Sequence, residues 1–271
     1  CDRRQRQMCI RDRYKYLCYS IVNEGKLDLL NNKEGFMETS DFYGTEKVSR
    51  ILLKIAPPVM LAQLIQALYN IVDSFFVGKY SETGLTALSI IYPVQLLMIA
   101  LGVGTGVGIN TDMAYYLGIG KKKKAEEVAG TGTPLGLILW IIFAAVCYVT
   151  LPAYAGMSTD SPEVIRDVVA YGRIVCLFSI GLFTEGIWSK ILQAEGDMRT
   201  PMIAQIAGAV VNIILDPLLI FGMLGMPEMG ISGAAVATVS GQIVAALIVM
   251  KKAWYRSPRR SCYPGHIKRI Y

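Results

Sequence analysis

The stretch that decides the fold is Arg199–Met223, which reads RTPMIAQIAGAVVNIILDPLLIFGM. It is mostly apolar and long enough to cross a bilayer as a helix, which needs about 20 residues at about 1.5 Å each. The stretch nevertheless contains an ionisable Asp216, which Pro217 follows directly and Asn212 precedes by one turn. A carboxylate in hydrocarbon costs at least ~2.5–3.5 kcal/mol. We therefore expect the Asp216 side chain to face protein or water and to have either an interaction partner or a functional role.

Polar and small residues recur along this stretch every three or four positions, so they share one helix face. They are Gln205, Gly208, Asn212 and Asp216. Ionisable groups inside membranes usually mark ion or substrate pathways, which favours a cation-binding role for the carboxylate. The alternative is an aspartate that caps or packs near a helix end.

The composition indicates an all-α protein, a polytopic transmembrane helical bundle. Of the 271 residues, 53% are hydrophobic and 18% are charged. Soluble domains average about 45–50% apolar residues and about 25% charged residues. The excess lies in blocks of membrane-crossing length, and segments in lipid must satisfy their own backbone groups. The net charge of +6 does not predict a nucleic-acid partner, because the basic residues cluster between the apolar blocks, as the positive-inside rule expects.

Six spans are predicted, at about 51–77, 85–110, 129–151, 164–192, 199–223 and 231–250. We expect a bundle over 45–256, preceded by a polar tail over 1–44 that is either disordered or the result of a wrongly assigned start. Residues 257–271 are expected to be a cytoplasmic linker. If the first helix runs outward, nearly all basic residues fall on one side of the membrane. This predicts a multi-pass protein of the cytoplasmic membrane with both termini in the cytoplasm.

The first span carries a polar stripe of its own, formed by Gln63, Gln66, Asn70 and Asp73. At about 100° per residue these side chains occupy one narrow arc, which should face the bundle interior rather than lipid. The first and fifth helices both run outward, and each has its aspartate a few residues before the outer end. Asp73 and Asp216 are therefore expected at similar depth. Together with Asn212 they could form one cavity that shares a proton or holds a cation such as Na⁺.

Other patterns predict no cofactor, metal site or enzyme. The alternate glycines of 102–108 lack the GxGxxG order and a surrounding βαβ unit, so they do not form a dinucleotide site. The six cysteines form no close CxxC pair, and His266 is the single histidine, so we expect neither a disulfide nor a zinc site. No Ser/His, Cys/His or HExxH constellation indicates catalysis. The four lysines Lys121–Lys124 are interpreted as a topology signal.

Several motifs, in this order along the chain, resemble the MATE family of multidrug and toxic compound extruders. They are APPVM at 56–60, LYNIVD at 68–73, VG at 77–78, QAEGDMRTP at 193–201, NIILDP at 212–217 and GISGAAVAT at 230–238. The resemblance covers about 46–256. It implies one lobe of a transporter built from two six-helix bundles, which exports cationic or amphipathic drugs and toxins in exchange for Na⁺ or H⁺.

The resemblance also implies site residues. The cation-binding residues would be Asp73, Asn212 and Asp216, with Thr238 as a weaker candidate. The interior-facing stripes add Gln63, Gln66, Asn70 and Gln205 as residues expected to line the substrate cavity. Glu185 departs from the commoner family pattern, in which Tyr and Asn are frequent nearby, so the polar contacts of the fourth span do not follow from the resemblance.

The family has about twelve helices, and this chain has about six. We therefore expect the amino-terminal half of a longer protein, with drug-like small cations, the lipid bilayer and a missing carboxyl-terminal lobe or second chain as partners. Two alternatives stay open. One is a lipid-linked precursor flippase or polysaccharide exporter of the same superfamily, for which Arg173 is the one hint of a basic cavity. The other is an inactive truncated membrane scaffold.

Overall fold

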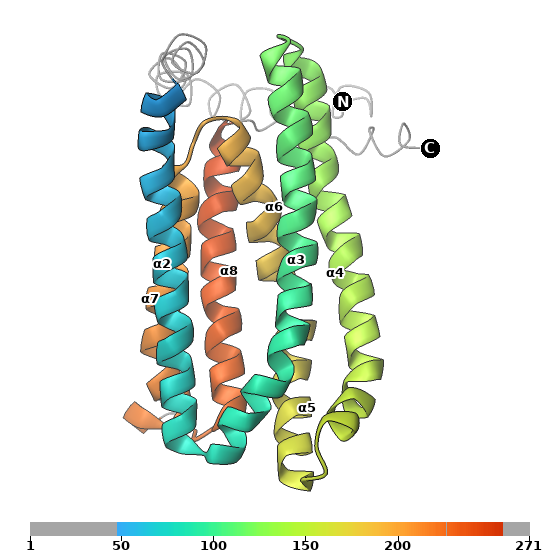
Figure 1. Ribbon diagram of the computed structural model, residues 1–271, viewed down its shortest axis with the longest axis vertical. Helices are drawn as coiled ribbons and strands as arrows, with labels where there is room; N and C mark the ends of the chain where they lie inside the picture. The colour runs from blue at the N-terminus through green and yellow to red at the C-terminus, as the bar shows by residue number, and fades with distance from the viewer. Residues whose placement is uncertain (1–47, 226, 257–271) are drawn as a thin grey trace, which may run out of the picture. The chain divides into compact units, whose positions relative to one another are not determined.

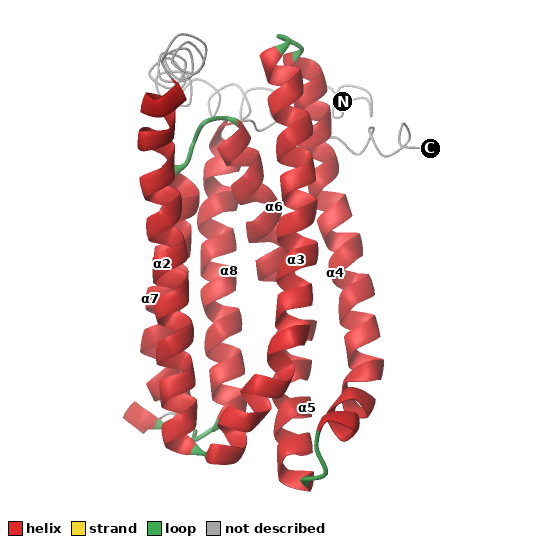
Figure 2. Ribbon diagram, in the orientation of Figure 1, coloured by secondary structure: helices red, strands yellow, loops and turns green. Residues whose placement is uncertain are grey.

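The computed structural model describes residues 48–225 and 227–256, and within them every regular element is helical (Figures 1 and 2). The elements are α2 Val48–Tyr80, α3 Glu82–Gly118, α4 Lys122–Ser158, α5 Pro162–Leu177, α6 Ile180–Ala194, α7 Arg199–Ile220, the short 3-10 turn η1 Met223–Gly225, and α8 Ile231–Arg256. The predicted all-α fold is confirmed. The predictions for the tail over 1–44 and the linker over 257–271 lie outside the described residues.

The chain divides into two units, residues 1–54 and 55–271, and all that follows concerns the second. Five of its helices are long and apolar enough to cross a membrane, or six spans if the bent pair α5–α6 counts as one. The helices α3 and α4, with 37 residues each, continue well past the apolar blocks at 85–110 and 129–151. At about 1.5 Å per residue they exceed the roughly 30 Å hydrocarbon core. A helix continues into polar sequence until a breaker ends it, here Gly120 with φ +73°.

The fourth predicted span, 164–192, is not one continuous helix. It breaks between α5 and α6 with a bend of 45°. The indole Nε1 of Trp140 donates to the carbonyl oxygen of Leu177 at 3.1 Å, and the Ser179 hydroxyl donates to the carbonyl oxygen of Cys176 at 2.8 Å. Side chains thus satisfy carbonyl groups that the break releases, as a backbone inside lipid requires.

The helices alternate in direction, so their connections gather at two ends of the bundle (Figure 1). The α3–α4 turn and the α6–α7 loop lie at one end, and the α2–α3, α4–α5 and α7–α8 connections lie at the other. Lys121–Lys124 and Arg199 belong to the first end. The basic residues of these two connections therefore share one end of the bundle, as the sequence predicts.

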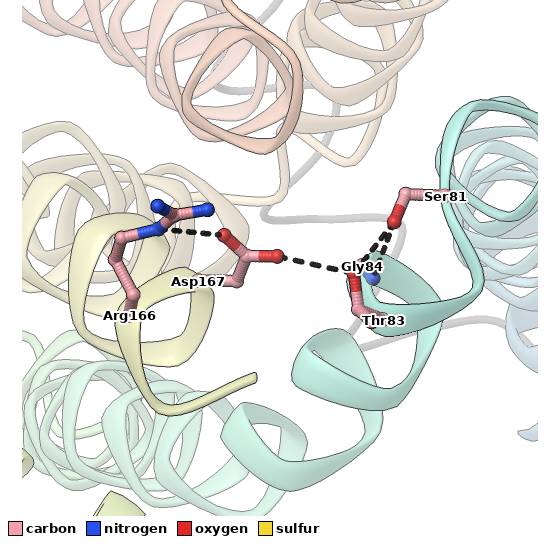
Figure 3. Close-up of polar contacts among 5 residues, drawn as sticks. All are labelled: Ser81, Thr83, Gly84, Arg166 and Asp167. Carbon is pink, nitrogen blue, oxygen red and sulfur yellow. Dashed lines mark hydrogen bonds and ion pairs between the residues drawn. The ribbon is translucent and has the colours of Figure 1, made fainter. Parts of the chain in front are cut away.

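The α2–α3 turn is attached to α5 by polar contacts (Figure 3). The Ser81 hydroxyl accepts from the backbone N–H of Gly84 at 3.3 Å, which caps α3, and lies 2.6 Å from the Thr83 hydroxyl. Thr83 in turn donates to Asp167 of α5 at 3.4 Å, and Arg166 lies 4.0 Å from the same carboxylate. This turn fixes where α2 ends relative to α5.

The carboxyl-terminal part of α2 packs on the end of α7 through aromatic rings. Phe76 and Tyr80 each contact Phe221 edge-on, with ring centroids 6.4 and 6.0 Å apart. The Tyr80 hydroxyl also donates to Glu228 at 3.1 Å. Gly230, at φ +55°, lies so close to the Tyr80 ring that a Cβ would come within 2.8 Å of it. These contacts anchor the half of α2 that carries Asp73.

Candidate cation and substrate site

Three of the four residues predicted to bind a cation, Asn212, Asp216 and Thr238, meet where α7 and α8 run side by side. Gly208 and Gly241 permit a close approach of the two helices, which places Asn212 of α7 opposite Thr238 of α8. The Asn212 Nδ2 lies 3.4 Å from both Asp216 Oδ1 and Thr238 Oγ1. The amide orientation that satisfies both of its ends donates to Asp216 Oδ2 at 3.3 Å and accepts from the Thr238 backbone N–H at 3.2 Å. Asn212 therefore links α8 to the carboxylate.

The two aspartates are both buried, at 6% exposure for Asp73 and 0% for Asp216. They come from α2 and α7, yet they lie close enough for their charges to interact. Asp73 Oδ1 has no hydrogen-bond partner in the part of the chain that the structure describes. Among the described residues, no lysine or arginine lies within 4.0 Å of either carboxylate. A buried acid pair without a compensating base is an arrangement that favours a bound cation or a shared proton.

A cavity of about 400 Å³ lies beside these residues, between α2, α3, α6, α7 and α8. All four residues predicted for a substrate cavity line it: Gln63, Gln66, Asn70 and Gln205. Asn212 and Thr238 also form part of its wall, whereas the two aspartates do not. Asn212 thus contacts the cavity on one side and Asp216 on the other. The structure brings the predicted residues together, and their roles stay predictions.

Several residues outside the predicted site set also line the cavity. They are Tyr69, Tyr92, Gln95, Glu185 and Gln242. One signal was available, because Gln242 follows Thr238 by one helical turn and so shares its face. The α3 and α6 helices give no polar stripe in the sequence. Their polar side chains in the cavity wall are only Tyr92 and Gln95 of α3 and Glu185 of α6, among the described residues.

Arg173, the one hint of a basic cavity, does not line it. Its guanidinium lies over the ring of Tyr148 at 4.9 Å from the centroid, on the α4–α5 side of the bundle. No lysine or arginine is among the lining residues in the described part of the chain. Arg173 therefore does not supply the basic cavity for which it was the one hint.

The chain matches the MatE family model over residues 58–218. It is 30% identical over 207 residues to the probable multidrug resistance protein NorM of Thermotoga maritima, covering 75% of this chain and 44% of that protein. It is 28% identical over 201 residues to an FAD transporter of Shewanella oneidensis, covering 73% and 44%. The chain thus spans less than half the length of these curated relatives.

Solved structures resemble this one closely. An outward-facing multidrug resistance MATE family transporter of the MOP superfamily superposes with a TM-score of 0.70 at 28% identity, covering 78% of this chain and 45% of that one. A MATE structure in the straight conformation gives a TM-score of 0.71 at 26% identity, covering 79% and 47%. With a family match over more than half of the 271 residues, the chain belongs to the MATE family of multidrug efflux transporters.

Proposed function

We propose that this chain is the amino-terminal lobe of an antiporter that exchanges Na⁺ or H⁺ for cationic or amphipathic drugs and toxins. The observation that carries the proposal is the buried pair of Asp73 and Asp216, which Asn212 connects to the cavity wall. No cofactor beyond the coupling ion is needed. The cavity holds the exported compound, and the acid pair takes the ion.

Ion occupancy and cavity shape are coupled through shared residues. A cation or proton at the acid pair removes the repulsion between α2 and α7, and so favours one arrangement of the two helices over the other. Asn212 and Thr238 would shift with that change, and both belong to the cavity wall. Because coupling is reciprocal, a compound in the cavity would also change the affinity for the ion.

A second lobe completes the proposed transporter. The matched relatives are more than twice as long as the aligned part of this chain, and alternating access needs two halves that rock against each other. We propose that a carboxyl-terminal lobe or a second chain supplies the other half, in the cytoplasmic membrane. Both termini lie in the cytoplasm, on the side of Lys121–Lys124.

Efflux from proteoliposomes tests the proposal. The transporter, in the form encoded by its gene, is reconstituted into vesicles with ethidium as substrate and driven in turn by a Na⁺ and an H⁺ gradient. Asp73→Asn and Asp216→Asn should each abolish gradient-driven efflux. Asp160→Asn, an exposed residue between α4 and α5, is the matched control and should transport normally. Undiminished efflux in both buried variants would remove the mechanism.

A further inference from the structure

Among the described residues that line the cavity, one has a carboxyl group, Glu185 of α6. Its Oε1 accepts from the Ser189 hydroxyl at 2.7 Å, and Gln205 of α7 lies next to it. No lysine or arginine among the described residues comes within 4.0 Å of it. Lys190, further along α6, attracts the Glu185 carboxylate electrostatically, but its Nζ donates to Gln193 Oε1 at 3.0 Å. Glu185 is thus a carboxyl group in a chamber whose other described lining residues are amides, aromatic rings, a threonine and apolar side chains.

A second acceptor of the same wall has no partner. Gln242 Oε1 is buried and makes no hydrogen bond to any described residue. Its backbone packs on Gly181 of α6, where a Cβ would come within 3.0 Å of the Gln242 carbonyl carbon. Glu185 follows Gly181 by one turn and so lies on the same face of α6. Glu185 and Gln242 therefore line the same cavity from two helices that are in close contact one turn before Glu185.

Both acceptors have room for a donor that the protein does not supply. A carboxylate offers about four lone-pair directions, so Ser189 and Gln205 leave part of Glu185 free. A buried acceptor without a partner carries a desolvation penalty that a bound donor relieves. Two acceptors in one cavity wall, one of them a carboxyl group, match a cationic head group with at least two N–H donors. Amidinium, guanidinium and primary ammonium groups have such donors, whereas quaternary ammonium and phosphonium ions have none.

We propose that Glu185 and Gln242 form the head-group subsite of the cavity and select N–H-bearing cations over cations without donors. Tyr69 and Tyr92, which also line the cavity, contact the aromatic body of the ligand. The subsite rests on the proposed function, since it assumes that the cavity holds the exported compound. The subsite is distinct from the acid pair of Asp73 and Asp216. Gln205, which lies next to Glu185, precedes Asp216 by three turns, or about 16 Å along α7.

Binding to the full 271-residue chain in lipid nanodiscs tests the subsite with two probes. One probe is DAPI, a fluorescent bis-amidinium, and the other is tetraphenylphosphonium, which has the charge but no donor. Glu185→Gln should lower the binding affinity for DAPI at least tenfold, as expected for the loss of a charge-assisted hydrogen bond. The same variant should lower the affinity for tetraphenylphosphonium by less than about threefold. Gln242→Leu should weaken DAPI several-fold and leave tetraphenylphosphonium unchanged. Glu163→Gln, on the exposed first turn of α5, should change neither.

Three results would overturn the subsite: unchanged DAPI affinity in Glu185→Gln, equal losses for both probes, or no binding of DAPI to the unaltered chain. Thermal unfolding and elution volume show whether each variant is folded, and Glu→Gln keeps the acceptor for Ser189. The efflux test of Asp73 and Asp216 is separate. Normal efflux in the aspartate variants together with weaker DAPI binding in Glu185→Gln would reject the ion coupling and keep the subsite. Abolished efflux in the aspartate variants together with unchanged DAPI binding in Glu185→Gln would keep the ion coupling and reject the subsite.

Discussion

Gly208 of α7 and Gly241 of α8 lie so close that a Cβ on either would come within 2.8 or 2.6 Å of the carbonyl oxygen of the other. No residue larger than glycine fits at this crossing without moving a backbone. The contact sets the register of the two helices, one turn away from the point where Asn212 meets Thr238. The geometry of the candidate cation site therefore depends on two residues that have no side chain.

Gly208→Ala and Gly241→Ala should each separate α7 from α8 and destabilise the bundle. Overpacking of this kind costs typically about 1–3 kcal/mol, which should lower the unfolding temperature measured in nanodiscs by several degrees. Gly104→Ala on α3 is the matched control, because nothing lies within 4 Å of its Cβ position, and it should be neutral or slightly stabilising. Equal unfolding temperatures in all three variants would show that the close approach is absent.

Asp73→Asn should stabilise the protein in buffer free of Na⁺. The substitution removes a buried charge that has an oxygen without a partner among the described residues and that interacts electrostatically with Asp216. Relief of such a charge is worth about 1–3 kcal/mol. The same variant should lose the rise in unfolding temperature that a cation gives by binding to the folded state. Thermal unfolding with and without Na⁺ measures both effects.

The control for Asp73→Asn is Asp167→Asn, whose carboxylate is part-exposed and accepts from Thr83 at 3.4 Å outside the acid pair. It should keep any response to Na⁺. A less stable Asp73→Asn variant would mean that the carboxylate has a partner in the folded protein. If Na⁺ does not change the unfolding temperature of the unaltered chain, the same measurement is made over a range of pH. A proton shared by the two carboxyl groups would then take the place of the cation, and its binding depends on pH.

Tyr154→Phe should weaken the contact between α4 and α3. The Tyr154 hydroxyl donates to the Ile90 carbonyl oxygen at 2.8 Å, and loss of one such bond costs about 1 kcal/mol. Tyr148→Phe on the same helix is the matched control. Its side chain is half exposed and keeps its ring over Arg173, so its unfolding temperature should not change. A larger loss in the control would assign the stabilisation to the Tyr148 hydroxyl instead.

Single cysteines introduced near the two ends of α4 should be accessible from opposite sides of the membrane. Lys123→Cys and Asp160→Cys are both at exposed positions, in a chain whose Cys1, Cys9, Cys18 and Cys262 are replaced by serine. Cys147 and Cys176 are buried and should not react. In intact cells, a membrane-impermeant maleimide should label Asp160→Cys and spare Lys123→Cys. The reverse pattern would invert the proposed orientation.

The sequence by itself determined the helical class, the spans and the polar stripes. Apolar blocks of membrane-crossing length leave a chain few options in lipid, because each segment must satisfy its own backbone. Helical spacing is a local property, so the residue numbers of Gln63, Gln66 and Asn70 are enough to assign them to one face. The break between α5 and α6 had no such signal, because no proline or glycine marks Phe178 or Ser179.

Only the tertiary structure decided which stripes meet. Asp73 and Asp216 are far apart in the chain, and their proximity depends on how α2 packs on α7 through Tyr80 and Phe221. The place of Glu185 and Gln242 in one wall likewise depends on the α6–α8 contact at Gly181. A helical pattern tells which side of its own helix a residue occupies, but the partner on the next helix follows from packing and crossing geometry.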